Sequence, residues 1–226
     1  MAIKAIVFDI GGILETIPEG GDPTSRFPQM LARWERRLDL TPVALSETIA
    51  MMDTRLKSAG KDGALGTCSY DEWVGELRAT TGWDEATTDA FMDDHWDTYI
   101  GEPNPELTAY FTSLRPRYKT ALLSNSFVGA REREQAARGF EDMADLIIYS
   151  HEVGLAKPDP RIYALTCERL GVQPAEMIFL DDSPGHIAAA RAFGIHGIVF
   201  HDNAQAIGEI EALLAAHHGG DGARAD

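Results

Sequence analysis

The sequence contains few cysteines and few positive charges. Of its 226 residues, two are cysteines, Cys68 and Cys167, and their spacing fits neither a disulfide framework nor a metal-binding motif. There are 20 Lys and Arg residues against 36 Asp and Glu residues, which gives a formal net charge of -16. Because this charge repels nucleic acid and anionic lipid surfaces, we expect neither as a partner.

Long hydrophobic runs are also missing from the sequence. No stretch approaches the ~18 apolar residues that a membrane-spanning helix needs. The apolar run at the start is too short for a signal peptide, and it carries Asp9. Together with the isolated thiols, these features predict a cytoplasmic protein.

Short apolar runs alternate with helical patterns through much of the chain. The runs predict buried strands over 3–10, 120–123, 146–149, 177–180 and 197–200. Helical spacing, caps and glycine stops predict helices over 105–114, 130–138, 159–171 and 183–194. This alternation is typical of an α/β fold with a doubly wound, parallel, Rossmann-like sheet.

Residues 22–101 break the alternation, since they contain no strong strand pattern. Apolar residues recur there at helical spacing over 28–40, 42–56, 70–80 and 85–99, and a glycine-rich loop spans 60–66. We therefore predict an all-helical insert. The proposed boundaries are a core formed by 1–17 and 102–218, an insert over 18–101, and a disordered tail over 219–226.

Polar side chains stand where the predicted strands end. Because ligands bind beyond the carboxyl ends of strands in an open parallel sheet, we expect these side chains to converge at one edge. Such a set can hold a hard cation through its oxygen atoms and a phosphate through Lys and Ser. The residues are Asp9, Ser124, Asn125, Lys157, Asp181 and Asp182.

Four segments resemble, in order, the four motifs of the haloacid dehalogenase (HAD) superfamily. They are VFDIGGIL, LLSNS, KPDPRIY and FLDDSPGHIAAARAFGI, and the resemblance covers 1–14 and about 103–214. The helical insert lies where capped members similar to sugar-phosphate phosphatases carry their cap. The resemblance implies a Mg²⁺-dependent phosphatase, which hydrolyses a small phosphorylated metabolite (a phosphate monoester) through an aspartyl-phosphate intermediate.

The resemblance also implies a role for each motif residue. Asp9 is the nucleophile, and Lys157 and Ser124 complete the catalytic set. The implied metal ligands are Asp9, the Gly11 carbonyl, Asp182, and Asp181 either directly or through water. The implied phosphoryl-binding residues are Ser124, Asn125, Lys157 and Gly12. A role in capping a turn remains an alternative for Asn125.

The match departs from the usual phosphatase pattern at Gly11, where a second Asp normally protonates the leaving group. General acid–base catalysis contributes ~10²–10⁴-fold, so we expect slow turnover, or a proton from the cap or the substrate. Two alternatives stay open. One is a metal-independent 2-haloacid dehalogenase, and the other is a catalytically weakened HAD-like binding protein. The retained pair Asp181-Asp182 favours the phosphatase, because adjacent carboxylates repel each other unless a cation intervenes.

The cap is expected to decide the substrate by closing over the site. Because such a cap closes off the pocket, it favours small metabolites such as sugar phosphates. Candidate cap contacts are Arg26, Arg33, Trp34, Trp73 and Trp96, although the tryptophans favour a role in the core of the cap. We expect a monomer or a homodimer.

Overall fold

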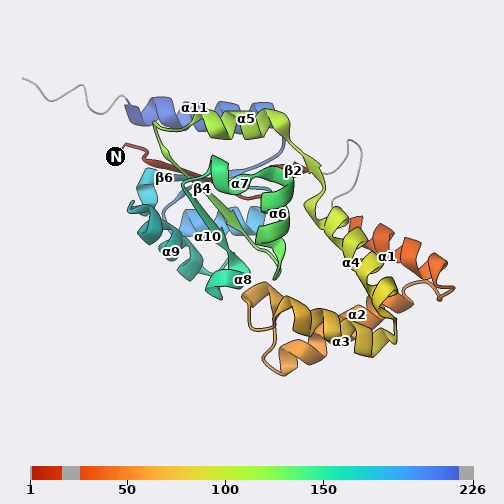
Figure 1. The fold of residues 1–226 in the computed structure, drawn as a ribbon. Coiled ribbons are helices and arrows are strands. Elements are labelled where there is room, and N and C mark those ends of the chain that lie inside the picture. Colours follow the sequence, from red (N-terminus) through yellow and green to blue (C-terminus); the bar gives the residue numbers. More distant parts are fainter. Residues whose placement is uncertain (1, 17–25, 219–226) are drawn as a thin grey trace, which may run out of the picture.

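The computed structural model describes residues 2–16 and 26–218. The predicted tail and the first part of the insert, 18–25, lie outside the described residues. Five strands form a parallel sheet in the order β5-β4-β1-β6-β7 (Figure 1), which confirms the predicted fold class. The strands are β1 (Ala5–Phe8), β4 (Lys119–Ser124), β5 (Leu146–Tyr149), β6 (Met177–Asp181) and β7 (His196–Val199).

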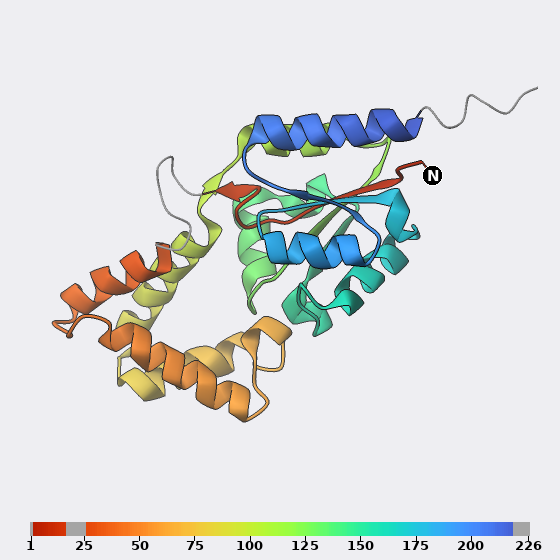
Figure 2. The same cartoon turned by 180° about the vertical axis from the view of Figure 1, so that it is seen from behind.

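Helices cover both faces of this sheet because its strands are apolar on both sides (Figure 2). In β1, Ile6 and Phe8 face one layer while Ala5 and Val7 face the other. The first layer contains α5 (Pro105–Ser113), α7 (Phe140–Met143) and α11 (Asn203–His218). The second contains α9 (Pro160–Leu170) and α10 (Pro184–Ala192).

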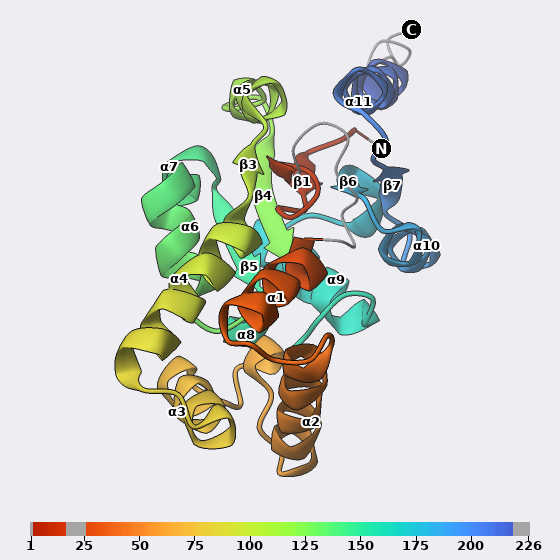
Figure 3. The ribbon, with the colours of Figure 1, turned by 90° about the vertical axis from the view of Figure 1, so that its right-hand side faces the viewer.

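Four helices between the first strand and the rest of the sheet form a separate layer, as Figure 3 shows. They are α1 (Arg26–Arg37), α2 (Ala44–Ser58), α3 (Tyr70–Thr81) and α4 (Glu85–Ile100). Their inner faces build a core of their own, which includes Trp34, Trp73, Phe91 and Trp96. Local chemistry sets their ends. Ser69 and Glu72 form a reciprocal capping box at the start of α3, and Asp84 caps α4.

Two short strands connect this helical layer to the sheet. β2 (Glu15–Thr16) pairs antiparallel with β3 (Glu102–Pro103), so the chain leaves the core and returns to it side by side. Asn104 then caps α5 and also donates to the Ile13 carbonyl at 2.9 Å. This two-stranded connection was not predicted, because two-residue strands leave no periodic pattern in a sequence.

Within the part of the chain that the structure describes, no helix is long and apolar enough to cross a membrane.

Candidate active site

The ends of three neighbouring strands bring the predicted residues together. Asp9 follows β1, Ser124 ends β4, and Asp181 ends β6. β1 lies between β4 and β6, and the Asp9 backbone N–H donates to the Leu180 carbonyl at 2.9 Å. Parallel pairing therefore places the three side chains at one edge of the sheet.

Lys157 lies at the centre of this edge with its side chain fully buried. Its ammonium Nζ is 2.9 Å from Oδ1 of Asp9 and 2.7 Å from Oδ2 of Asp181. The residue belongs to the loop between α8 (Ser150–Val153) and α9. A buried cation between two buried carboxylates compensates for charge that would otherwise be costly to remove from water.

The side chain of Asn125 holds Lys157 in place. Its amide Nδ2 donates to the Lys157 carbonyl at 2.8 Å, and its Oδ1 accepts from the Lys157 backbone N–H at 2.7 Å. Both polar atoms of the Asn125 side chain are thus used on one backbone segment. The structure gives Asn125 the geometry of a positioning residue for Lys157.

Asp9 is 8% exposed and uses one of its two carboxylate oxygens for support. Oδ1 accepts from the Ile10 backbone N–H at 2.8 Å and pairs with Lys157, while no described residue bonds Oδ2. Burial raises the pKa of Asp9 to about 7; Lys157 opposes this rise and the negative charge of Asp181 adds to it. A further cation beside Asp9 would favour its ionised, nucleophilic form.

Asp181 is fully buried, and both of its oxygens have partners. Oδ2 accepts from Lys157, while Oδ1 accepts from the Ser183 backbone N–H at 2.8 Å and lies 3.0 Å from Nδ1 of His186. Burial tends to raise the pKa of Asp181, but the bonds from His186 and Lys157 prevail and hold it below its ordinary value. Asp181 is thus an ionised anchor for Lys157.

Asp182 differs from its neighbour because it is exposed and lies against the backbone of Gly12. A Cβ atom added at Gly12 would lie 2.2 Å from Oδ2 of Asp182, and the backbone φ of Gly12 is +77°. The positive φ is the reason that favours glycine at position 12, and the short distance shows how closely Asp182 approaches its backbone. Partial burial of its carboxylate, followed by the negative charge of Asp181, raises the pKa of Asp182, and Lys157 opposes this rise.

These residues fit a magnesium ion. Asp9 and Asp181 both pair with Lys157, and the charges of Asp181 and Lys157 act on Asp182. Carboxylate and carbonyl oxygens are the ligands that Mg²⁺ prefers. Donor atoms of Asp9, Asp181 and His186 lie within 4.8 Å of one another, a group that includes the unpredicted His186 and leaves out the predicted ligand Asp182.

Two more predicted positions lie beside this group. Ser124 is 3% exposed, and its hydroxyl makes no hydrogen bond to a described residue, which leaves it available to a ligand. Gly11 is exposed, and a Cβ built there meets no atom within 4 Å. A larger side chain, such as the Asp that the phosphatase motif carries at this position, would therefore have room at residue 11.

A pair of buried glutamates near the site was not predicted. Glu15 is 2% and Glu134 is 1% exposed. Burial raises the pKa of Glu15 to about 9, with Glu134 as the next cause, and raises that of Glu134 to about 7. Tyr149 donates its hydroxyl to Glu134, and Nε of Arg138 is 3.6 Å from Oε1 of Glu15.

This glutamate pair reaches the site electrostatically, because the charge of Asp9 is among the causes that raise the pKa of Glu134. One sequence feature points to it. In α6 (Ala130–Arg138), Glu134 follows the buried Ala130 by four residues and so shares its inward face. A glutamate at a core position of a helix is a sign of a buried polar cluster.

The helical layer contacts the core directly above the site. The 3₁₀ turn Gly63–Leu65 meets the loop after β4, where the Val128 backbone N–H donates to the Gly63 carbonyl at 3.2 Å. The hydroxyl of Ser150 donates to the Ala64 carbonyl at 2.8 Å. The predicted loop over 60–66 thus contains this short turn, which closes the layer onto the sheet.

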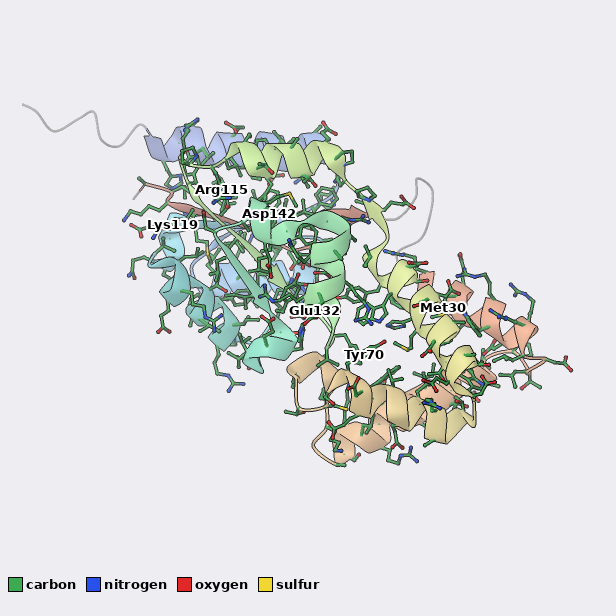
Figure 4. All side chains as sticks on the ribbon, viewed as in Figure 1. Met30, Tyr70, Arg115, Lys119, Glu132 and Asp142 are labelled. Atoms are coloured by element: carbon green, nitrogen blue, oxygen red, sulfur yellow. The ribbon has the colours of Figure 1, made fainter. Side chains whose placement is uncertain are left out.

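A single arginine also joins the two layers. The guanidinium of Arg133, on α6, lies 4.6 Å from the ring centre of Tyr70 and 4.2 Å from that of Trp96. Tyr70 begins α3, and its label in Figure 4 lies at the gap between the helical layer and the core. Such cation–π contacts contribute about 1–2 kcal/mol when partly buried.

Replacing Arg133 by Ala is therefore expected to loosen the contact between the layers. Exchange of the Val128 backbone N–H should become about tenfold faster, because the cation–π contacts that favour the closed arrangement are lost. Hydrogen exchange followed by NMR measures this. Arg36→Ala, which removes an exposed arginine of α1, is the control and should leave Val128 unchanged. Equal exchange in all three proteins would contradict a joining role for Arg133.

The remaining candidate residues of the insert divide into two groups. Arg33 and Trp34 both bond to Asp94, at 2.8 Å, so their polar atoms serve the helical layer itself. Arg26 belongs to the same group, because it donates to the Thr98 carbonyl of α4. Trp73 forms the second group, since it is the candidate that lines the described cavity of the helical layer.

Comparison with known proteins agrees with this geometry. A family model described as a haloacid dehalogenase-like hydrolase matches residues 3–194. A phosphatase of Mycobacterium tuberculosis, MT3486, is 34% identical over 91% of this chain and 90% of its own length. The bifunctional epoxide hydrolase 2 of Sus scrofa is 26% identical over 94% of this chain, but the match spans 39% of that longer protein.

Solved structures show the same fold. An enzyme of the HAD family from Bacteroides thetaiotaomicron, in complex with magnesium and inorganic phosphate, superposes with a TM-score of 0.70 at 20% identity. The match covers 91% of this chain and 99% of that one.

Proposed function

Because this chain belongs to the haloacid dehalogenase-like hydrolase family, we propose that it is a Mg²⁺-dependent phosphatase acting on a small phosphate monoester. Its 34% identical relative is a phosphatase, and a structural neighbour binds magnesium and phosphate, which supports this choice. The proposed reaction passes through an aspartyl-phosphate on Asp9.

In the first step, Oδ2 of Asp9 attacks phosphorus while the bond from phosphorus to the leaving oxygen breaks. Residue 11 supplies no acid, so the departing oxygen takes its proton from water. A water molecule then attacks the phosphorus of the aspartyl-phosphate. This step releases inorganic phosphate and restores the Asp9 carboxylate.

The other residues of the site lower the repulsion between the carboxylate and the phosphoryl group. Lys157 compensates the charge of Asp9 and of the transferring group, and the Ser124 hydroxyl with the Asn125 backbone binds phosphoryl oxygens. The backbone N–H of Gly12, also predicted to bind them, instead donates to the Glu15 carbonyl at 2.8 Å. Magnesium held by Asp9, the Gly11 carbonyl and Asp182 would supply further positive charge to the same oxygens.

One observation carries this proposal, namely the surplus of carboxylates around Lys157. Asp181 already uses its oxygens on Lys157, Ser183 and His186, while Asp182 lies exposed over Gly12. Without a bound cation, the repulsion between Asp182 and the neighbouring carboxylates would destabilise the folded protein, and a neutral residue at position 182 would remove it. Asp182 therefore favours a metal-dependent reaction, with Asp181 as the support of Lys157.

The glycine at position 11 favours a second candidate, a metal-independent 2-haloacid dehalogenase, whose members also lack that acid. In this reaction Asp9 would displace halide from carbon instead of oxygen from phosphorus. A third candidate is a weakened site that binds a phosphorylated ligand without turnover. Chloride release from a 2-chloro acid in EDTA would establish the second, and tight phosphate binding without product the third.

The test of the proposal is hydrolysis of p-nitrophenyl phosphate by the purified protein, first with Mg²⁺ and then with EDTA. This ester has a good leaving group, so it needs little acid assistance and tolerates Gly11. We expect nitrophenolate release that depends on the metal. No release in either condition would reject the phosphatase proposal in favour of the two alternatives.

Introducing an acid at position 11 should raise the rate for esters with poor leaving groups. Gly11→Asp is expected to increase kcat for methyl phosphate ~10–100-fold, while kcat for p-nitrophenyl phosphate changes less than ~3-fold. Space for the new side chain exists, since nothing lies within 4 Å of its Cβ. Gly75→Asp, at an equally open position on α3, is the control. Unchanged methyl phosphate turnover would show that proton supply at residue 11 does not limit the rate.

The proposed partner is a small phosphorylated metabolite, and the proposed compartment is the cytoplasm. The acidic net charge of -16 argues against nucleic acid as a substrate. A monomer or a homodimer is the proposed oligomeric state.

A further inference from the structure

The cap, defined as helices α1–α4, forms a partly open cavity of about 350 Å³ that also borders the loop after β4. We call this cavity the cap pocket. Its wall is mainly aromatic and apolar. Met30, labelled in Figure 4 where α1 and α4 meet, belongs to it. The other principal wall residues are Phe27, Trp73, Phe91, Tyr99 and Phe127.

The cap pocket is large enough to hold a small molecule. The share of liquid volume that one water molecule occupies is about 30 Å³. At that share the pocket has room for roughly twelve non-hydrogen atoms. It also falls at the lower end of the range for small-molecule sites, which begins near ~300 Å³.

Two polar residues line the cap pocket, and neither supplies a positive charge. Oδ1 of Asp53 accepts from Nε1 of Trp73 at 2.8 Å. Burial, with the nearby positive charge of Arg133, lowers the pKa of His95 to about 4, so its imidazole is neutral at physiological pH. No Lys or Arg is among the described residues of the wall. An anionic group in the pocket would have no cation to pair with.

Two wall residues of the cap pocket lie near the proposed active site. Phe127 follows Ser124 by three residues on the loop after β4. The ring of Tyr99 lines the pocket, and its phenol lies within electrostatic reach of Asp9. After burial, the charges of Glu134, Glu15 and Asp9 raise the pKa of Tyr99. The pocket therefore lies on the side of the proposed site that faces the helical layer.

We propose that the cap pocket binds the leaving group, and that the preferred substrates are phosphate monoesters of neutral, mainly apolar alcohols of roughly ten non-hydrogen atoms. This inference rests on the proposed phosphatase function. A polyol of equal size would lose hydrogen bonds to water and find few partners in the wall. The chemistry of the wall therefore points away from the sugar phosphates that a closed cap alone suggests.

The first test compares 2-phenylethyl phosphate with ribitol 5-phosphate, whose leaving groups are primary alcohols of similar size. We expect kcat/KM to be at least ~30-fold higher for the phenylethyl ester. Because both esters have leaving groups of similar reactivity, the ratio reports on binding of the substituent. Equal or higher kcat/KM for ribitol 5-phosphate would overturn the inference.

A matched pair of variants places the effect in the cap pocket. Met30→Gln introduces an amide of similar shape into the buried wall, whereas Met51→Gln makes the same change at a position that is 66% exposed. Met30→Gln should lower kcat/KM for 2-phenylethyl phosphate ~10-fold and leave methyl phosphate, which has no large substituent, within ~2-fold. Met51→Gln should change neither. An equal loss for both esters in Met30→Gln would indicate a general folding defect and overturn the assignment.

A binding measurement separates this inference from the phosphatase proposal. Saturation-transfer NMR detects 2-phenylethanol bound to the unmodified protein without any reaction. If no ester is hydrolysed but the transfer is present and is lost in Met30→Gln, the pocket assignment stands and the phosphatase proposal fails. If esters are hydrolysed without any preference and no transfer is seen, the phosphatase proposal stands and the pocket assignment fails.

Discussion

Replacement of Asp9 by Asn is expected to lower kcat for p-nitrophenyl phosphate by at least ~10⁴-fold, because an amide cannot form the aspartyl-phosphate. The substitution keeps the size of the side chain, and Lys157 keeps its 2.7 Å pair with Asp181. Rates measured at saturating substrate with Mg²⁺ test this. Asp93→Asn, which changes an exposed carboxylate of α4, is the control and should retain full activity.

The same variant should be more stable than the unmodified protein in metal-free buffer at pH 8. The pKa of Asp9 is about 7 in the folded protein, against an ordinary value of 3.8 for an unfolded chain. A raised folded pKa contributes stability below pH 3.8, and that contribution is lost as the pH rises to about 7. The amide side chain of the variant does not titrate, so its advantage should grow between pH 4 and pH 7.

Urea unfolding in EDTA across this range measures the advantage of Asp9→Asn. A variant that is inactive and more stable would show that the nucleophile is kept ionised at a cost in stability. Full hydrolysis by Asp9→Asn would reject Asp9 as the nucleophile. A loss of activity accompanied by unfolding would not support the covalent mechanism either, so the two measurements belong together.

Replacement of Lys157 by Met should have the second largest effect, on activity and stability together. Without the ammonium, kcat/KM should fall by ~10³-fold or more, since a charge aimed at the reacting group is lost. The free energy of unfolding at pH 8 should fall by about 3–5 kcal/mol, because two buried carboxylates lose their shared cation. Lys61→Met, which removes an exposed partner of Glu72 3.0 Å away, is the control and should leave the free energy of unfolding nearly unchanged.

The stability loss in Lys157→Met should depend on pH in a defined direction. Lys157 lowers the pKa of Asp9, so its removal raises that pKa above about 7. At pH 5 Asp9 then carries a proton and needs no cation, and the loss should be smaller than at pH 8. Unfolding in EDTA at the two pH values measures this. An equal loss at both would mean that packing of the lysine stem, and not charge, accounts for its effect.

Several features of this protein can be read from the order of its residues. The parallel sheet was predicted because buried strands read as short apolar runs, and helical patterns separate them in a regular order. The convergence of Asp9, Ser124 and Asp181 was predictable because the carboxyl ends of parallel strands meet at one edge. Motif order carried the family, and the family model over 3–194 confirms it.

Other features of the site depend on side-chain directions and on distances between segments far apart in the chain, which no local sequence pattern encodes. Asn is a residue type common in turns, so the sequence did not indicate the hydrogen bonds of Asn125 to the Lys157 backbone. Those bonds join two segments that are 32 residues apart. The pair Glu15 and Glu134 comes from two elements far apart in the sequence, the short strand β2 and helix α6 of the core. Polar residues in such contacts look like solvated ones until their burial is known.

The sequence alone specified the fold class, the family and the strand ends at which the chemistry is placed, because periodicity and motif order are local properties of the chain. The three-dimensional arrangement established how the charges around Lys157 balance, which residues of the helical layer line the pocket, and how closely Asp182 approaches Gly12. These properties depend on burial and on contacts between distant segments. Both arise from packing, which the spacing of residues along the chain does not specify.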